Sequence, residues 1–120
     1  MSDGAALAKE MLLEARASVE QGWCQGASAR DGQGSPVQPW SPLAAQWSAI
    51  GGLVAVWARR RAAASDLERA IAGFQLANVA LLQAMGSSPA EWNDRAERTL
   101  EDVLAAFERA CASLDEATAA

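Results

Sequence analysis

The sequence predicts an all-α fold, an irregular bundle of four main helices with one short helix and a loop or small hairpin after the first helix. Apolar residues recur at helical spacing along four long stretches. Alanine, leucine, glutamate, arginine and glutamine dominate these stretches, and all five favour helix. The chain has no tyrosine and no long run of β-branched residues. With 120 residues, of which 51% are hydrophobic, it can bury one modest core, and we expect a single helical domain over residues 1–120.

The first helix is predicted from about Asp3 to Gln21. Gly22 follows this helix and is predicted to end it in the left-handed backbone conformation. Trp23 can then fold back onto the last turn of the helix. The apolar stripe of this helix comprises Leu7, Ala8, Met11, Leu12, Ala15 and Val19.

Residues 24–40 form the only extended stretch without helical periodicity. The glycine-rich segment Asp31–Gly34 lies between two short flanks, which favours a small hairpin. The flanks show little apolar alternation, so an irregular loop is an equal alternative. The segment has too few acids for a calcium loop, and it lacks the Gly-Lys-Ser/Thr ending of a phosphate loop.

The second helix is predicted to begin at Ser41-Pro42, a capping hydroxyl followed by proline in the first turn, and to end near Arg61. Apolar residues occupy most of its sides, so we expect this helix to form the centre of the fold. Gly51-Gly52 should let a neighbouring helix approach closely. Any part left uncovered should be an interface, which favours a homodimer over a monomer. The apolar residues are Leu43, Trp47, Ile50, Leu53, Val54, Val56 and Trp57.

A third helix is predicted from a capping box of Ser65 and Glu68 to about Met85. Asn78 falls inside its apolar stripe, and we expect an interhelical hydrogen bond there, with a ligand contact as the alternative. The predicted core face comprises Leu67, Ile71, Phe74, Leu81, Leu82 and Met85.

Two more helix starts follow. Residues 88–91 have the pattern of a capping box with proline at the first position, which predicts a short helix through residues 92–94. Thr99 with Asp102 forms another capping box, which begins the last helix. The buried stripe of that helix comprises Leu100, Val103, Leu104, Phe107, Ala110, Cys111 and Leu114.

Charge and composition argue against several functions. A net charge of −5 argues against nucleic-acid binding, which needs a basic face. The one basic run, Arg59–Arg61, is interpreted as a solvated helix end, with a phosphate or acidic-partner contact as the alternative. Histidine is absent, so Ser-His-Asp and Cys-His mechanisms are excluded within one chain. Cys24 and Cys111 are isolated thiols, and we expect no metal site and no cofactor.

The chain shows no sign of a membrane or export segment. It begins without a basic stretch followed by an apolar one. The longest apolar run, residues 49–58, is too short to cross a bilayer. We therefore expect a cytoplasmic protein without membrane contact.

Two polar-aromatic patches are the candidate site. One is Trp92-Asn93-Asp94 followed by Arg98-Thr99, and the other is the segment Gly22–Gly26. Asp94 and Arg98 are four residues apart, which predicts an ion pair if the segment is helical. A structural role, fixing the start of the last helix, competes with a ligand-binding role. The candidate binding residues are Trp23, Gln25, Trp92, Asn93, Asp94, Arg98 and Thr99.

These motifs resemble a family of small bacterial and phage proteins classed as a domain of unknown function. The family pattern is a helix, Gly-Trp-x-Gln-Gly, Ala-Arg-Asp-x-x-Gly, Trp-x-x-x-Gly and Trp-Asn-Asp-x-x-x-Arg-Thr. The resemblance spans about residues 5 to 115 and implies a compact, mainly helical domain, without implying any activity. The matching positions are Gly22–Gly26, Ala29–Asp31, Trp47 with Gly51, and Trp92–Asp94 with Arg98-Thr99.

The function favoured by the sequence is a non-enzymatic binding or interaction module in the bacterial cytosol, with a protein partner or a second copy of the chain. One alternative is a phage-type inhibitor that docks on a host or immune complex through its acidic surface. Another is a small enzyme with a pocket around Asn93, Asp94 and Arg98. No residue is assigned a catalytic role.

Overall fold

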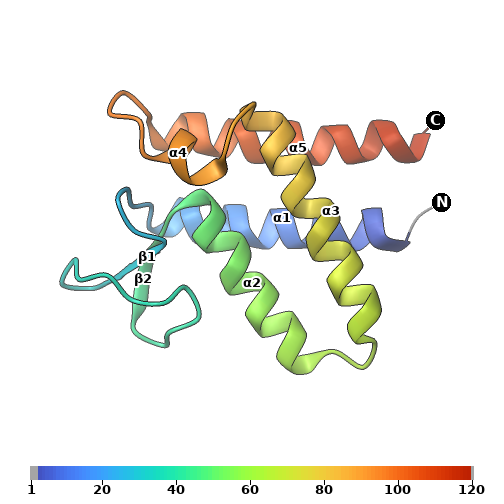
Figure 1. The fold of residues 1–120 in the computed structure, drawn as a ribbon, viewed down its shortest axis with the longest axis horizontal. Helices are drawn as coiled ribbons and strands as arrows, with labels where there is room; N and C mark the ends of the chain where they lie inside the picture. The colour runs from blue at the N-terminus through green and yellow to red at the C-terminus, as the bar shows by residue number, and fades with distance from the viewer. Residues whose placement is uncertain (1–2, 120) are drawn as a thin grey trace.

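The computed structural model describes residues 3–119 and is mostly helical, with a small two-stranded antiparallel sheet (Figure 1). The predicted helical architecture is confirmed, but the fold is not strictly all-α because the sheet follows the first helix. The elements are α1 (Asp3–Gln21), β1 (Ala29–Asp31), β2 (Ala44–Trp47), α2 (Ala49–Ala63), α3 (Leu67–Met85), α4 (Pro89–Asn93) and α5 (Leu100–Ala119).

Helix α1 is the centre of the fold, since it packs against α2, α3, α5 and strand β2. Its buried side chains include Met11, Leu12 and Val19, all with no exposed surface. In Figure 1, α1 and α5 lie side by side and antiparallel, while α2 and α3 form a hairpin that crosses them. The prediction that the second helix is central is wrong.

The second helix begins later than predicted. Ser48 is its cap, and the Ser48 hydroxyl accepts a hydrogen bond from the Gly51 N–H at 3.0 Å. Ser41 makes a turn instead, in which its hydroxyl accepts from the Leu43 N–H at 3.1 Å. Residues 44–47 become β2 because their backbone finds partners far away in sequence, such as the Gly22 carbonyl, which accepts from the Trp47 N–H at 2.8 Å. Tertiary pairing thus overrides a local capping signal.

Both alternatives for residues 24–40 hold in part. Strand β1 pairs with β2, with Ala29 opposite Trp47. On its other edge β1 forms a short bridge of the predicted hairpin, because the Asp31 N–H donates to Ser35 O at 2.8 Å and the Val37 N–H donates to Ala29 O at 3.1 Å. The rest of the segment is irregular.

Glycines permit close backbone contacts in this region. A Cβ at Gly22 would lie 2.3 Å from Ala45 O, so close approach explains this glycine rather than the predicted left-handed conformation. A Cβ at Gly51 would lie 1.8 Å from Ser28 O, and one at Gly52 would lie 2.8 Å from Val19 of α1. The predicted close approach of a neighbouring helix is confirmed at Gly52, whereas Gly51 lies against the loop backbone at Ser28.

The third helix has the predicted length, but of its predicted core face only Leu81 and Met85 are buried. Asp66 rather than Ser65 caps it, by accepting from the Arg69 N–H at 3.1 Å. Asn78 is only half-buried. Small residues face α1, and Gly73 brings the helices so close that a Cβ would lie 2.8 Å from Leu7. The buried residues are Ala70, Gly73, Ala77, Ala80, Leu81 and Met85, whereas Leu67, Ile71 and Leu82 of the predicted core face are exposed.

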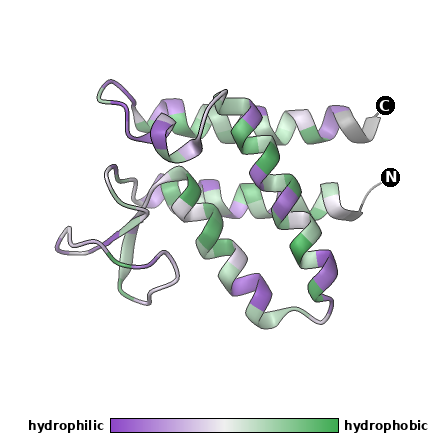
Figure 2. Ribbon diagram, in the orientation of Figure 1, coloured by the Kyte–Doolittle hydropathy of each residue, from purple (hydrophilic) through white to green (hydrophobic). Residues whose placement is uncertain are grey.

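The last two helices begin where predicted. Helix α4 has Pro89 in its first turn, although the Ser88 side chain makes no capping bond. The capping box of α5 is complete, since the Thr99 N–H donates to Asp102 Oδ2 at 3.1 Å and the Asp102 N–H donates to Thr99 Oγ1 at 3.2 Å. Figure 2 shows a hydrophilic band in the last turns of α2, the part of the helix where the sequence has Arg59–Arg61. Within residues 3–119, no helix has the length and apolar character needed to cross a membrane.

Candidate functional site

The two candidate patches meet in the structure. The Gly22–Gly26 segment, which follows α1, lies against α4 and the start of α2. Asn93, the last residue of α4, lies at the junction with no exposed surface. We call this set of contacts the motif junction; its members are Trp23, Cys24, Gln25, Gly26, Ala49, Asn93 and Asp94.

The Asn93 side chain uses its full hydrogen-bonding capacity inside the protein. Its Oδ1 accepts from Trp23 Nε1 at 2.8 Å and from the Ala49 N–H at 3.0 Å. Its Nδ2 donates to Cys24 O and to Asp94 Oδ1, both at 3.1 Å. An amide has two donor hydrogens and two acceptor lone pairs, so no group of this side chain is left for a ligand.

Gln25 and Asp94 complete the junction. Gln25 Nε2 donates to the carbonyl oxygens of Asn93 and Arg95, each at 2.9 Å. Asp94 Oδ1 also accepts from the Gly26 N–H at 3.0 Å. These bonds hold the C-terminal end of α4 on the loop after α1.

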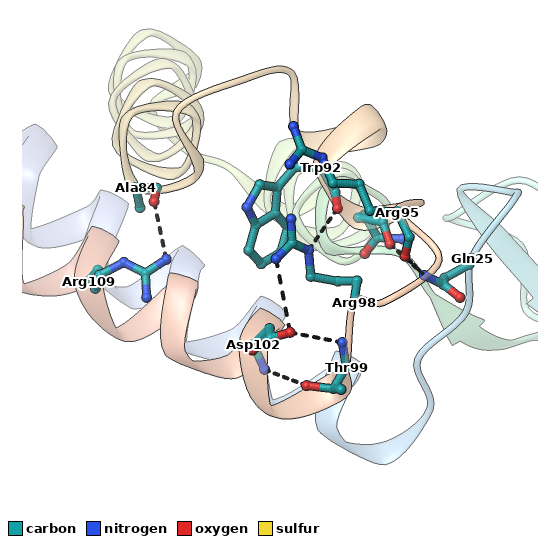
Figure 3. Close-up of polar contacts among 9 residues, drawn as sticks. Gln25, Ala84, Trp92, Arg95, Arg98, Thr99, Asp102 and Arg109 are labelled. Atoms are coloured by element: carbon teal, nitrogen blue, oxygen red, sulfur yellow. Dashed lines mark hydrogen bonds and ion pairs between the residues drawn. The ribbon is translucent and has the colours of Figure 1, made fainter.

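Arg98 belongs to a second cluster, at the start of α5 (Figure 3). Its guanidinium carbon lies 3.7 Å from the centre of a Trp92 ring, and its Nε donates to Trp92 O at 2.9 Å. One terminal nitrogen lies 4.0 Å from Asp102 Oδ2, and Asp102 forms the capping box with Thr99. The sequence predicts one cluster of Trp92, Asp94, Arg98 and Thr99 at the start of the last helix. Trp92, Arg98 and Thr99 do meet there through Asp102, but Asp94 bonds to Gly26 and Asn93 instead.

The predicted ion pair of Asp94 with Arg98 is wrong. The Asp94 carboxylate binds Gly26 and Asn93, while Arg98 lies on Trp92 and near Asp102. Residues 94–99 form turns rather than continuous helix, so a spacing of four does not bring the two side chains onto one face. Asn93, Asp94 and Arg98 therefore do not point into one pocket.

Cys24 lies within the motif junction and is buried. Burial raises the pKa of its thiol, with the nearby Arg30 guanidinium opposing this rise and the Asp94 carboxylate adding to it. A raised pKa disfavours the thiolate, which is the reactive form. Among residues 4–116, whose side chains the structure describes, no three potential metal ligands gather.

A small cavity of about 220 Å³ lies beside Asp94. This volume is below the roughly 300–1,000 Å³ of most ligand pockets. Its lining comprises Gly26, Ala27, Ser28, Ser48, Ile50, Ala90 and Asp94.

A larger groove lies on the outer side of α2, with a volume of about 540 Å³. Its α2 residues recur at helical spacing and form one stripe, and Trp40 from the loop before β2 forms the opposite wall. We call it the Trp40 groove; it is lined by Trp40, Val54, Trp57, Ala58, Arg61 and Ala62. The sequence pattern missed it, because the loop that carries Trp40 was expected to lead directly into a helix.

Contacts hold the Trp57 ring and the backbone beside Trp40 in place. Trp47 Nε1 donates to Pro39 O at 3.1 Å, which fixes the backbone beside Trp40. Trp57 stacks on Phe74 of α3, with ring centroids 5.1 Å apart. The Trp40 side chain nevertheless remains 58% exposed. Tryptophan side chains are typical anchors of recognition surfaces, and this one is exposed.

Arg61 places a positive charge at the groove. Its neighbour Arg60 forms an ion pair with Glu14 of α1. Across the described side chains, no carboxylate pairs with Arg61. An anionic group in the groove would thus meet an uncompensated guanidinium.

The structure is that of a small, mostly helical protein in which buried polar motifs hold the helix ends together and one aromatic groove stays open. The chain matches the profile of DUF6197, a family of unknown function, over residues 5–113, and it belongs to this family. The expected membership in a family of unknown function is thereby confirmed, and a bacterial or phage origin stays a prediction. No curated protein and no solved structure matches the chain.

Proposed function

We propose that this protein is a non-enzymatic binding module whose ligand site is the Trp40 groove. The observation that carries the proposal is the exposed Trp40 indole facing the α2 stripe of Trp57 and Arg61. An apolar groove with a few polar groups is the usual form of a small-molecule site, and about 540 Å³ falls in the usual size range.

The groove chemistry supports an amphipathic ligand with one anionic group. Trp40 and Trp57 offer flat apolar faces to a ring or a branched alkyl group. Arg61 offers a guanidinium that binds carboxylate, sulfonate or phosphate oxygens by charge-assisted hydrogen bonds. The acidic balance of the chain, −5, disfavours long polyanions and leaves a single anionic group as the best fit.

The motif junction, unlike the Trp40 groove, has little capacity left to bind a ligand. Every polar group of the Asn93 side chain is already bonded within the chain. A ligand there would have to break buried hydrogen bonds, at a cost of about 1–3 kcal/mol for each group left unpaired. The motif residues therefore serve to build the fold, and the ligand binds elsewhere.

The proposal can be tested with the fluorescent probe anilinonaphthalene sulfonate, an aromatic anion of suitable size. Trp40→Ala should weaken its binding about tenfold or more, which is about 1.4 kcal/mol. Arg61→Gln should weaken binding of the sulfonate probe several-fold but should leave binding of the uncharged analogue N-phenyl-1-naphthylamine unchanged.

Arg59→Gln is the matched control, because Arg59 is an exposed arginine of the same helix outside the groove. It should bind both probes like the parent. Equal effects of Arg59→Gln and Arg61→Gln, or parental binding by Trp40→Ala, would contradict the proposal.

A further inference from the structure

From Ala70 to Met85, the outer face of α3 is uncharged and largely apolar. No residue from Ala70 to Met85 carries a charge, although 21% of the chain is charged. Leu67, Ile71, Val79 and Leu82 are each between 38% and 50% exposed on this helix. A surface helix of a monomer usually presents charges to water, so an uncharged outer face indicates an interface.

One stripe of this face has the spacing of a coiled-coil seam. Ile71, Gln75, Asn78 and Leu82 follow each other at intervals of four, three and four residues. Ile71, Gln75 and Leu82 are exposed, and Asn78 is half-buried. The seam has apolar residues at both ends and amides in the middle. Its order of apolar and amide residues is therefore the same whether α3 is read from its N-terminus or from its C-terminus.

We infer that two copies of this protein associate through an antiparallel pair of α3 helices. A two-fold axis near residues 76 and 77 sets Ile71 opposite Leu82 of the partner subunit, and Gln75 opposite Asn78 of the partner subunit. The apolar layers exclude water, and the central amides can hydrogen-bond to each other across the axis. A buried polar layer of this kind sets the register of paired helices.

The charge distribution is compatible with a second copy as the occupant. Each copy carries a net charge of −5, which opposes self-association, and the uncharged stretch from Ala70 to Met85 adds no close like-charge contact to this repulsion. A basic or acidic partner would find no complementary charge there. Glu68 lies on the seam one turn before Ile71, and a parallel pair would set two Glu68 carboxylates together, whereas an antiparallel pair separates them.

The area of the exposed α3 face indicates how tightly two copies should associate. The exposed parts of Leu67, Ile71, Val79 and Leu82 amount to on the order of 300 Å² per copy, against about 800 Å² per partner in a standard interface. Phe74 and the seam amides add to this area. We therefore expect a weak dimer that forms at high protein concentration.

This surface differs from the one predicted from the sequence. The apolar run of the second helix is largely covered, since Leu53, Ala55 and Val56 are buried. Its partly uncovered residues Val54 and Trp57 line the Trp40 groove, whereas the face inferred to dimerise lies on α3. The residues described as lining the Trp40 groove all lie outside α3, so the two surfaces are separate.

Sedimentation equilibrium of the full chain, from about 10 µM to about 1 mM, tests the dimer. The mass should rise from 12.6 kDa toward twice that value. The Leu82→Glu variant should have the same helical circular dichroism spectrum as the parent and should show the monomer mass over the whole concentration range. Leu13→Glu is the control, because Leu13 is similarly exposed but lies on α1. It should dimerise like the parent.

A charge exchange tests the antiparallel register. Ile71→Glu and Leu82→Lys should each be monomeric alone, whereas their mixture should dimerise, because the antiparallel layer sets the new carboxylate of one variant against the new ammonium group of the other. A parallel pair would not bring these charges together. If the parent protein keeps a mass of 12.6 kDa up to about 1 mM, the proposed dimer is wrong. If the parent dimerises but the mixture of the two variants stays monomeric, the antiparallel pairing is wrong.

Discussion

The Asn93 side-chain oxygen lies 2.8 Å from the Trp23 indole nitrogen, across 70 residues of sequence. The same oxygen accepts from the Ala49 N–H, the first amide of α2. One buried amide thus joins the end of α4, the loop after α1 and the start of α2. This arrangement makes Asn93 a central structural residue of the fold.

Asn93→Ala should destabilise the protein by about 2–4 kcal/mol, because it leaves the Trp23 N–H, the Ala49 N–H and the Cys24 carbonyl without this partner. Urea unfolding followed by circular dichroism measures this change. Asn78→Ala, at the other asparagine of the chain, should change the free energy of unfolding by less than about 0.5 kcal/mol. Similar losses in both variants would refute the structural role of Asn93.

Thr99→Ala should cost about 1 kcal/mol of stability, since the Thr99 hydroxyl accepts from the Asp102 N–H in the capping box of α5. Ser88→Ala is the matched control at another helix start. The Ser88 side chain makes no capping bond, so its removal should stay within about 0.5 kcal/mol. Thermal unfolding of the two variants under one condition compares them directly, and a larger loss for Ser88→Ala would be inconsistent with the structure.

Local signals in the sequence predicted much of the fold. The bounds of α1 and the capping box of α5 follow from residues close to one another in the chain, and both are confirmed. The start of α2 was mispredicted because Ser41-Pro42 is a good cap in isolation, while the backbone pairing of Trp47 with Gly22 is distant in sequence. The buried face of α3 was predicted only in part, at Leu81 and Met85, because Gly73 and small neighbours pack on Leu7 and hydrophobicity alone favours the larger side chains.

The candidate site was likewise predicted only in part, because local sequence signals do not show contacts between distant residues. Aromatic and amide residues at helix ends marked Trp23 and Asn93 as candidates, but their spacing could not show that they bond to each other. The Trp40 groove depends on where a loop crosses α2, which no local pattern contains.

Gly51→Ala should destabilise the protein by about 1–3 kcal/mol, because its Cβ would lie 1.8 Å from Ser28 O and the backbone would have to shift. Gly32→Ala is the control, since a Cβ there meets no atom within 4 Å. Its stability should be unchanged or higher by up to about 1 kcal/mol, through the smaller entropy of the unfolded chain. Chemical denaturation distinguishes the two; a Gly51→Ala variant as stable as the parent would contradict the close contact.

Cys24 should react slowly with iodoacetamide at about pH 8 in a Cys111→Ala background. Burial raises the pKa of the Cys24 thiol in the folded protein, so its thiolate fraction at a given pH is smaller than in the unfolded chain. Alkylation followed by mass spectrometry should be at least about tenfold slower than in urea, and the ratio should shrink as the pH rises above the folded pKa. Equal rates in the folded and unfolded chains would show that the thiol is accessible and that its pKa is not raised, against the structure.

The most direct test of the account compares Gln25→Ala with Trp40→Ala in both stability and probe binding. Gln25→Ala removes two hydrogen bonds of the motif junction and should lower the free energy of unfolding in urea by about 1–2 kcal/mol, while anilinonaphthalene sulfonate binds as it does to the parent. Trp40→Ala should keep the free energy of unfolding, because this side chain is 58% exposed, and should weaken the probe about tenfold. The opposite pattern, with Gln25→Ala losing the probe at unchanged stability and Trp40→Ala binding it normally, would place the ligand site at the motif junction and contradict the account.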